Sequence, residues 1–490
     1  MSQQTELPEL DSVGVLRYAW RQLTSMRTAL ILLLMLGVAS IPGSLFPQRT
    51  QNPIQVGQFF KDSPELARWM DRFHLFDVYG SPWFSAIYIL LFISLIGCVL
   101  PRTIEHFHSA RALPPSTPKN LSRMEHHSTW IADGSELEAA RAWFKSKRFR
   151  VLEKDGSISA EKGFARETGN LLFHLALILV LLGISFSSLF GMRGEAIINI
   201  GERFVNTPTS YDTLTYGKLY KDGNLPAFML TTDKFDAQYN LETSAPEDYT
   251  LDISLLREGG SVVEKKVIKV NSPLTIGSTR IYLQANGYSP VVTVRDSKGN
   301  VAFQGPVPFL PQDSNLRSIG AIKVPDAEPQ IGFVGSFVPT YVRDPNGGGA
   351  LSAFPKALDP RLLLAAWAGD LGLDSGIPQS VYRIDTSDML QVGLKSLKPG
   401  EVFEYPGGSI KFEGYIQWVN LNFVADPGKN FALFGGIVAI LGLLASLFTR
   451  RRRIWIRVGT QVEVAGLAKN DAPGLDVEME QFVRMLKGEK

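Results

Sequence analysis

One residue has both the type and the position for chemistry: a histidine inside a run that is otherwise apolar. His174 lies within residues 171–190, which contain no Asp, Glu, Lys or Arg. About 20 apolar residues in a helix are enough to cross a bilayer, so the imidazole would lie at membrane depth. An ionisable group there costs free energy on insertion and calls for a partner. The residues leave three roles open: a hydrogen bond that fixes helix packing, a proton relay, or ligation of a metal or haem.

On a helix, His174 would belong to a mainly polar stripe. At about 100° per residue, four positions fall within about 40° of His174: Asn170, Leu181, Ser185 and Ser188. Neutral imidazole is a good ligand for haem iron, but ligation by two histidines needs a second one. No other apolar run of the sequence contains a histidine. A second ligand at membrane depth must therefore come from another chain.

The other histidines give weaker signals. His74 precedes the second apolar run and is interpreted as a loop or interfacial histidine. His106 and His108 have a spacing that could contact a metal, but they lack carboxylate or thiol companions. We therefore assign them to a solvated connector, in the same segment as His126 and His127.

Arg193 follows the apolar run that holds His174. A guanidinium in this position could hold a haem propionate or an acidic lipid head group through two hydrogen bonds. An ordinary anchor, whose charge extends to the aqueous interface, explains the residue equally well. The sequence leaves both interpretations open.

Residues 191–430 contain neither cysteine nor histidine. The single cysteine of the chain, Cys98, lies in the second apolar run, where a buried and inert thiol is expected. A disulfide within the chain, a relay between two of its thiols and a Cys/His zinc site in 191–430 are therefore excluded. This segment lacks the usual groups for nucleophilic or metal catalysis. We expect a platform that positions another molecule, and not an enzyme active site.

The elements that would position these residues are four transmembrane helices, predicted at residues 29–46, 83–100, 169–190 and 431–448. The chain has 490 residues, of which 45% are hydrophobic and 20% charged, a mixture typical of a membrane protein with a sizeable water-exposed part. Its net charge of +2 is too small to argue for nucleic acid as a partner. The first helix is interpreted as an anchor and not as a cleaved signal peptide, because 28 residues precede it.

Basic residues indicate the orientation of these helices. They flank the helices on one side, which the positive-inside rule makes cytoplasmic. The basic residues are Arg17, Arg21, Arg27, Arg102, Arg111, Lys162, Arg166 and the run from Arg450 to Arg453. Residues 1–28, 101–168 and 449–490 are then cytoplasmic, whereas the loop 47–82 and the domain 191–430 are extracytoplasmic.

The two larger water-exposed segments differ in their predicted structure. Residues 101–168 are expected to form a small cytoplasmic α+β insert, with a helix near 135–149 and strands at 149–153 and 157–161. Residues 191–430 are expected to form a large β-rich domain, an antiparallel sandwich or barrel, because short strands alternate with Gly and Pro. Its predicted strands are 249–256, 262–270, 280–285, 291–296, 380–384, 410–413 and 416–423. The other predicted elements there are a loop at 344–349 and a short helix at 360–368.

Small residues in the last predicted helix indicate close packing. Gly435, Ala439, Gly442 and Ser446 recur at spacings of four, three and four residues. They fall on one helix face, where another helix can approach closely. Ser94, four residues before the cysteine of the second helix, is interpreted in the same way.

Several short motifs lie at the ends of the predicted helices and in the large domain. They are Ser25-Met26-Arg27-Thr28-Ala29, Ile41-Pro42-Gly43-Ser44, Ser81-Pro82-Trp83-Phe84, Gly97-Cys98-Val99-Leu100-Pro101-Arg102, Gly169-Asn170-Leu171-Leu172-Phe173-His174, Val270-Asn271-Ser272-Pro273-Leu274, Gly287-Tyr288-Ser289-Pro290 and Arg452-Arg453-Ile454-Trp455. In this order and spacing they resemble the ResB (also called CcsB) family of System II cytochrome c biogenesis proteins, especially its actinobacterial members. The resemblance runs from about residue 14 to 460. The segment after residue 465 falls outside it and has no assigned role.

The resemblance implies a non-catalytic or co-catalytic assembly subunit in the bacterial cell membrane. Such a subunit pairs with a multispan partner of the ResC (CcsA) type. The pair moves haem across the membrane and supports its covalent attachment to apocytochrome c. His174 corresponds to the family's membrane histidine, an axial ligand of a haem b that is held transiently and shared with the partner. A thioredoxin-like thiol reductant protein is a further partner that the resemblance suggests.

Two other classes of function make different predictions for this sequence. A haem b quinol enzyme usually has two or more pairs of histidines in its membrane helices, and this chain has a single membrane histidine. A membrane-anchored receptor or scaffold with an extracellular β domain would have no haem role, and it would leave c-type cytochromes normal in a deletion strain.

Overall fold

The computed structural model describes residues 11–49, 51–257, 259–260, 262–343, 349–375, 380–468 and 474–489. The chain divides into two compact units, one formed by Met1–Ser185 with Gly428–Lys490 and the other by Phe186–Pro427. Two stretches that lie far apart in the sequence therefore build the first unit, which carries the apolar helices.

Four helices within the described residues are long and apolar enough to cross a membrane, as the sequence predicts. They are α2 (Met26–Leu45), α5 (Pro82–Arg111), α7 (Ala165–Phe190) and α8 (Lys429–Phe448). α5 continues well past its predicted end at residue 100, so the segment interpreted as a solvated connector begins as helix. Pro101 removes one backbone donor from this helix, but the turn is maintained and the Thr103 hydroxyl donates to the Val99 carbonyl at 2.9 Å.

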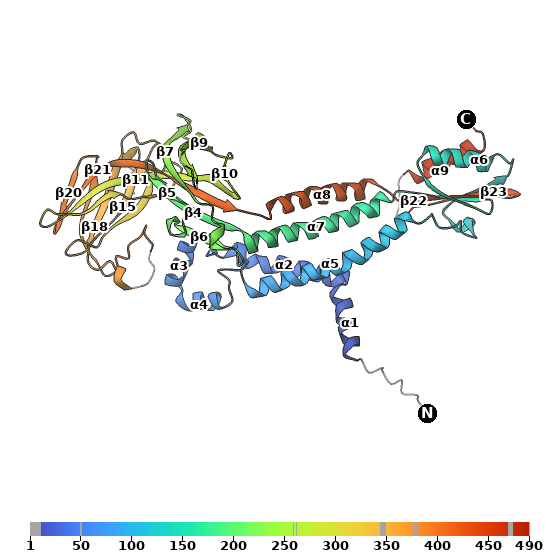
Figure 1. The fold of residues 1–490 in the computed structure, drawn as a ribbon, viewed down its shortest axis with the longest axis horizontal. Coiled ribbons are helices and arrows are strands. Elements are labelled where there is room, and N and C mark those ends of the chain that lie inside the picture. The colour runs from blue at the N-terminus through green and yellow to red at the C-terminus, as the bar shows by residue number, and fades with distance from the viewer. Residues whose placement is uncertain are drawn as a thin grey trace, which may run out of the picture. The chain divides into compact units, whose positions relative to one another are not determined.

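α7 and α8 run side by side and antiparallel, and they pack through small residues (Figure 1). Their buried residues, which we call the small-residue seam, are Gly169, Ala176 and Gly183 on α7 and Gly435, Ala439 and Gly442 on α8. A Cβ built on Gly183 would lie 2.7 Å from the backbone nitrogen of Ala432. Such close approach requires small side chains, so the packing face predicted for the last helix is confirmed.

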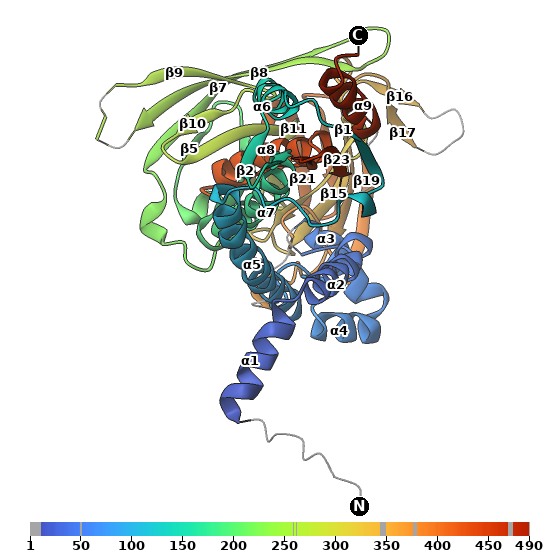
Figure 2. The same ribbon diagram turned by 90° about the vertical axis from the view of Figure 1, so that its right-hand side faces the viewer.

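A shorter helix, α1 (Ser12–Leu23), precedes α2 and extends away from the packed helices in both ribbon views (Figures 1 and 2). Its end contacts α5, where the Ser94 hydroxyl donates to the Leu23 carbonyl at 2.5 Å. A Cβ built on Gly97 would lie 2.1 Å from the side chain of Thr24. Ser94 therefore has the packing role expected of it, against the end of α1.

The predicted loop 47–82 also contains helices. α3 (Pro53–Asp62) and α4 (Pro64–Arg72) each begin with a proline in the first turn, where the missing N–H costs nothing. Val56, Met70 and Phe76 are buried in a small core between them.

The predicted insert and the C-terminal segment together form one α/β domain. Its elements are β1 (His126–Ile131), α6 (Glu136–Ser146), β2 (Arg150–Lys154), β3 (Ser157–Lys162), β22 (Arg452–Val458), β23 (Gln461–Ala468) and α9 (Leu475–Leu486). The strand order is β1-β23-β22-β3-β2, so both parts of the chain contribute to one sheet. α6 packs on α9 through aromatic rings, with the ring centroids of Phe144 and Phe482 4.9 Å apart. The helix and hairpin predicted for the insert are confirmed, and the segment after residue 465 is part of a folded domain.

The second unit is the predicted β-rich domain, and its strand pairing is antiparallel as expected. Its strands are β4 (Met192–Asn199), β5 (Arg203–Val205), β6 (Thr213–Tyr216), β7 (Phe228–Tyr239), β8 (Pro246–Arg257), β9 (Glu264–Lys269), β10 (Leu274–Ile276), β11 (Thr279–Asp296), β12 (Val301–Pro306), β13 (Leu310–Pro311), β14 (Ser318–Val324), β15 (Ile331–Val338), β16 (Tyr341–Arg343), β17 (Ala350–Ser352), β18 (Arg361–Ala368), β19 (Leu390–Leu397), β20 (Val402–Tyr405) and β21 (Gly408–Ala425). β11 and β21 pair along their whole length and form the centre of a sheet ordered β10-β11-β21-β4-β6.

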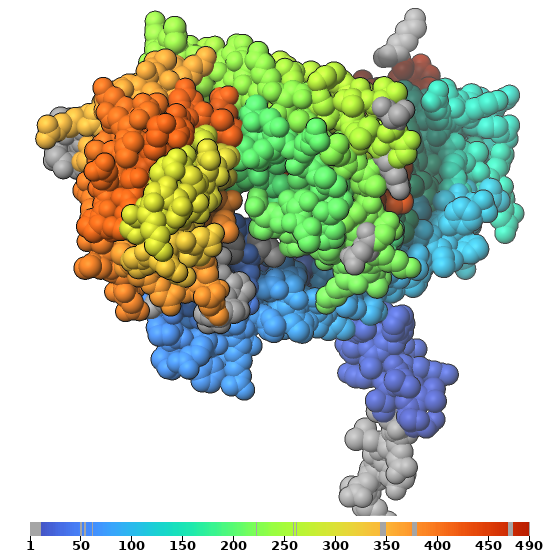
Figure 3. All heavy atoms as spheres, turned by 60° about the vertical axis from the view of Figure 1, so that its left-hand side comes forward, coloured from blue at the N-terminus to red at the C-terminus, as the bar shows by residue number. Residues whose placement is uncertain are grey.

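The two long strands β11 and β21 serve two hydrophobic cores. One core packs against β7 and β8, and the other packs against β14, β15 and β18. Figure 3 shows the corresponding lobes, one in green and one in yellow and orange. Trp418 is buried on β21, and its indole N–H lies 3.2 Å from the Tyr288 carbonyl and 3.1 Å from the Phe309 carbonyl.

Some of the secondary structure predicted for this domain was wrong. The predicted helix at 360–368 is strand β18, because Leu362, Leu364 and Ala366 alternate into the core and the strand pairs with β15 and β19. Pairing with neighbouring strands overrides the helical preference of Leu and Ala. Residues 380–384, predicted as a strand, form a turn and irregular backbone. The strands predicted at 280–285 and 291–296 are one continuous strand, as are those at 410–413 and 416–423. Most of the loop predicted at 344–349 lies outside the described residues.

Candidate functional site

His174 lies on the face of α7 that is turned away from the small-residue seam. It is separated from Ala176 by about 160° around the helix at about 100° per residue. The ring is half-buried and packs against Phe173, with the ring centroids 5.2 Å apart. Its Nδ1 atom is buried and has no hydrogen-bond partner among the described residues. A buried polar atom without a partner costs free energy, so the imidazole is not satisfied within the described chain. Its Nε2 atom is not among the buried atoms and is the nitrogen open to a contact from outside.

Polar contacts join α5 to α7 before and after His174 along the helix. Toward one end, the Tyr88 hydroxyl donates to the Leu181 carbonyl at 2.7 Å and accepts a hydrogen bond from Ser185 at 3.2 Å. Toward the other end, His106 Nε2 lies 2.8 Å from the Thr168 hydroxyl. Tyr88 and His106 thus hold α5 against α7 at two levels. His174 lies at the level between them.

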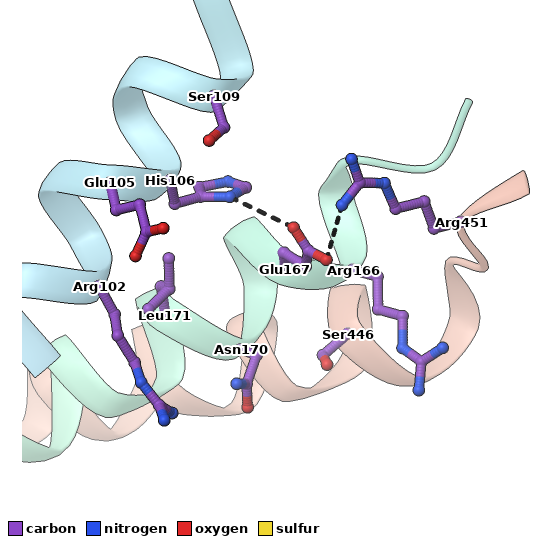
Figure 4. Close-up of a pocket in the computed structure, with 10 residues that line it drawn as sticks. All are labelled: Arg102, Glu105, His106, Ser109, Arg166, Glu167, Asn170, Leu171, Ser446 and Arg451. Atoms are coloured by element: carbon purple, nitrogen blue, oxygen red, sulfur yellow. Dashed lines mark hydrogen bonds and ion pairs between the residues drawn. The ribbon is translucent and has the colours of Figure 1, made fainter. Parts of the chain in front are cut away.

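A cavity of about 700 Å³ opens between α5, the start of α7 and the end of α8 (Figure 4). We call it the arginine cavity, and its lining residues are Arg102, Glu105, His106, Ser109, Arg166, Glu167, Asn170, Leu171, Ser446 and Arg451. Asn170 lies one helical turn, about 6 Å along the axis, from His174. Because Asn170 and His174 share the polar stripe of α7, the cavity continues the histidine face toward the start of this helix.

Glu167 links two walls of the arginine cavity. Its carboxylate lies 2.8 Å from Arg451 Nη1 and 3.6 Å from His106 Nδ1, as the dashed lines in Figure 4 show. Arg451 also binds Glu161 at 2.5 Å, and Arg453 binds the same oxygen of Glu161 at 2.8 Å. Burial lowers the pKa of Arg451, but its hydrogen bonds with Glu161 and Glu167 outweigh burial and raise that pKa above its usual range. Arg451 is therefore a fixed charge that holds the α/β domain to the start of α7.

Arg193, the other predicted site residue, lies in the β-rich unit. It is exposed on β4, where its backbone pairs with Val424 and its carbonyl accepts a hydrogen bond from Thr215 at 3.2 Å. Its guanidinium has no hydrogen-bond or ion-pair partner among the residues that the structure describes. The contact with a propionate or a lipid stays a prediction.

The remaining histidines and the cysteine occupy ordinary positions. His74 lies in an exposed turn with φ of 56°, and Cys98 is a free thiol whose Sγ lies 3.3 Å from the Leu95 carbonyl. His106 was misassigned, because it is a helical residue in a polar network and not part of a solvated connector. The described residues contain no group of three or more His, Cys, Asp or Glu arranged to hold a metal ion.

Most of the cavity residues were missed in the sequence. A signal was present in α5, since Arg102, His106 and Ser109 follow one another at spacings of four and three residues on one helix face. This pattern was overlooked because the helix was expected to end at Pro101. Arg451 carries no local signal, because its partners Glu161 and Glu167 are distant in sequence.

The residues present fit one half of the haem site that the family resemblance implies. A half-buried imidazole with one unpartnered nitrogen, on a face of α7 that α8 leaves uncovered, suits an axial ligand. Among the histidines of the described membrane helices, His174 is the one that lies inside an apolar run. The second axial ligand would have to belong to another subunit.

Comparison with known proteins matches the sequence of this chain to one family. A family model described as the ResB-like family matches residues 26–480. This match includes most of the segment after residue 465, which the sequence interpretation had wrongly left outside the resemblance.

Curated relatives agree with the family match. A protein named "Cytochrome c biogenesis protein CcsB" from Gloeobacter violaceus is 23% identical over 473 residues, covering 95% of this chain and 90% of the relative. Proteins of the same name from Crocosphaera subtropica and Prochlorococcus marinus are 22% and 24% identical, over 93% and 95% of this chain and 92% and 97% of theirs. The narrower resemblance to actinobacterial members stays a prediction. Because the family model matches most of its length, this chain belongs to the ResB-like family.

Proposed function

We propose that this chain is the ResB-type subunit of a System II cytochrome c synthase, an assembly subunit in the cell membrane. In this function His174 provides one axial ligand of a haem b that crosses the membrane, and a multispan partner of the ResC (CcsA) type provides the other. The observation that carries the proposal is the half-buried imidazole of His174, which has no hydrogen-bond partner among the described residues. Haem, when bound, supplies the iron that this imidazole ligates and the vinyl groups that later form thioethers.

The surroundings of His174 support a ligand shared between subunits. α8 covers only the opposite face of α7, through the small-residue seam. Leu172, Leu182 and Ile184 on α7 are exposed in the isolated chain, so lipid or a partner's helices must cover them in a membrane. Leu182 and Ile184 lie about 80° to either side of His174 around α7, so a partner's helices would pack beside α5, which contacts the histidine face through Tyr88.

The β-rich unit would act outside the membrane as a platform that docks apocytochrome c or braces the partner. The basic flanks of the membrane helices support this orientation, with both termini in the cytoplasm. Residues 191–430 contain no thiol, so reduction of the apocytochrome cysteines would fall to a separate thioredoxin-like protein.

The test is to purify the chain together with its partner and to record the haem content and the visible spectrum. His174→Gly is expected to abolish the low-spin spectrum of haem with two axial nitrogen ligands, and added imidazole is expected to restore it. His127→Ala, on β1 in the α/β domain, is the matched control and should leave haem content unchanged.

Two results would contradict the proposal. Unchanged haem content in His174→Gly would exclude the ligand role. Normal covalent haem in the c-type cytochromes of a deletion strain would instead favour a receptor or scaffold without a haem role.

A further inference from the structure

The helix α1 has an apolar face that the described residues leave uncovered. At about 100° per residue, six apolar side chains fall within an arc of roughly 160° around the helix: Val13, Val15, Leu16, Ala19, Trp20 and Leu23. No residue of α1 is buried, and Val13, Leu16 and Trp20 are 49%, 69% and 56% exposed. Because a helix with such a face normally buries it, α1 needs a partner outside the described chain.

The remaining side of α1 is basic. It carries Arg17 and Arg21, which lie about 40° apart around the helix, and α1 contains neither Asp nor Glu. Arg27 follows in the first turn of α2. The side chains of these three arginines have no ion pair or hydrogen bond among the described residues. The acidic residues of the N-terminal segment all precede the helix: Glu6, Glu9 and Asp11. An apolar face beside such cations is typical of a helix that lies on an anionic membrane.

The end of α1 lies close to the level at which the apolar run of α5 ends. The Leu23 carbonyl accepts a hydrogen bond from the Ser94 hydroxyl at 2.5 Å, and a Cβ built on Gly97 would lie 3.7 Å from the Trp20 ring. Ser94 and Gly97 precede the end of this run, at Leu100, by six and three residues, or about 9 and 4.5 Å along the axis. Interfacial helices bury their apolar face to a similar depth, about 5–10 Å.

The chain turns sharply between α1 and α2. The Thr24 hydroxyl donates to the Trp20 carbonyl at 2.8 Å, and the Ser25 hydroxyl accepts from the Thr28 N–H at 3.2 Å. These bonds end one helix and begin the next, so the turn takes only two residues. As a result α1 runs crosswise to α2 and α5, which pack beside each other (Figures 1 and 2). A helix that leaves a membrane-spanning bundle sideways at this level lies along the membrane surface.

We propose that α1 is a membrane-surface helix that binds anionic phospholipid. Its apolar arc enters the boundary of the acyl chains, and Arg17 and Arg21 contact the lipid phosphates. A protein could also cover an apolar face, but the crosswise course, the depth of the turn and the unpaired arginines together favour lipid. This inference goes beyond the proposed function and does not depend on haem binding.

The experiment uses the full chain in nanodiscs of phosphatidylcholine, with or without phosphatidylglycerol. Single nitroxide labels are attached to Leu16→Cys in the apolar arc and to Tyr18→Cys, about 160° away around the helix. Both are made in a Cys98→Ser background, since Cys98 is the one native cysteine. Electron paramagnetic resonance then measures how far oxygen and a water-soluble nickel chelate reach each label. The label at Leu16→Cys should be open to oxygen and shielded from the chelate, whereas the label at Tyr18→Cys should be open to the chelate.

The charge is tested by Arg17→Gln with Arg21→Gln in the chain labelled at Leu16→Cys. Phosphatidylglycerol should move this label deeper, because each basic residue near an anionic surface strengthens binding by about fivefold. The double variant should lose this shift in depth. Arg484→Gln, at an exposed position of α9 in the α/β domain, is the matched control and should retain it.

Three results would overturn the inference. Equal access of the nickel chelate to both labels would place α1 in water. Shielding of both labels from both reagents would mean that a protein covers the helix. A label depth that does not change with phosphatidylglycerol, or that still changes in the double variant, would exclude anionic lipid as the ligand of these arginines. None of these measurements involves haem, so each result is independent of the proposed function.

Discussion

The backbones of Gly169 on α7 and Gly442 on α8 lie in direct contact. A Cβ built on Gly442 would stand 2.8 Å from the Gly169 carbonyl oxygen, and one built on Gly169 would stand 2.6 Å from the Gly442 carbonyl oxygen. This contact sets the rotation of α7 about its own axis, and the rotation turns His174 away from α8.

Gly442→Ala should therefore destabilise the helix pair, because the added methyl group would lie 2.7 Å from the Phe173 backbone nitrogen. Overpacking of this kind costs about 1–3 kcal/mol, which would lower the midpoint of thermal unfolding in detergent. Gly436→Ala is a matched control on the same helix, since a Cβ there meets nothing within 4 Å. Equal unfolding midpoints for the two variants would contradict close packing at the small-residue seam.

Tyr88→Phe tests the contact that closes α5 onto α7 beyond His174. The substitution removes the hydrogen bond to the Leu181 carbonyl and the acceptor for Ser185. Hydrogen bonds between membrane helices contribute about 0.6 kcal/mol on average, so we expect a small loss of stability in a detergent-unfolding titration. Tyr18→Phe, whose ring is exposed on α1, should show no loss. A loss as large as that of Gly442→Ala would mean that Tyr88 has a further role.

The features carried by local patterns could be predicted from the sequence. His174 is visible because one imidazole interrupts an apolar run, and the α8 side of the seam is visible because Gly435, Ala439 and Gly442 follow the helical period. Neither signal needs knowledge of the partner helix. The polar stripe of α7 was found in the same way, and Tyr88 contacts it at Leu181 and Ser185.

Features that depend on distant segments could not be predicted in this way. The sheet of the α/β domain pairs β3 with β22, for example Glu161 with Arg453, and nothing near either residue indicates the other. The arginine cavity has the same origin, since Arg102, Arg166 and Arg451 come from three segments that lie far apart in the sequence. β18 was mistaken for a helix because its Leu and Ala residues favour helix locally, whereas its pairing partners lie elsewhere in the chain.

Asp212 makes the stability of the β-rich unit depend on pH. Burial raises the pKa of this carboxyl, although a hydrogen bond from the Ile197 N–H at 2.6 Å acts in the opposite direction. The folded state therefore retains the proton to a higher pH than the unfolded state, whose Asp pKa is about 3.9. Stability falls as the pH rises from that value through the folded-state pKa, and is constant above it.

Asp212→Asn should remove this pH dependence and raise the unfolding midpoint at neutral pH, because the amide oxygen can still accept from Ile197. The measurement is the midpoint of thermal unfolding between pH 4 and 8, for the variant and the wild type. Asp236→Asn, an exposed residue of β7, is the control and should follow the wild-type curve. A lower midpoint for Asp212→Asn at neutral pH would show that the ionised carboxylate stabilises the fold.

Glu161 joins the α/β domain to the membrane helices, and its removal should have the largest effect. The carboxylate is 1% exposed and lies between Arg451 at 2.5 Å and Arg453 at 2.8 Å. Removing one member of such a buried pair costs about 3–5 kcal/mol, because the charges left behind have no partner. Glu161→Gln should therefore unfold the α/β domain at lower temperature, followed by tryptophan fluorescence. Glu153→Gln, on β2 of the same sheet, removes the exposed pair with Arg141 of α6 and should cost much less, because exposed ion pairs contribute little to stability. Equal losses of stability in Glu161→Gln and Glu153→Gln would contradict the role of the buried carboxylate.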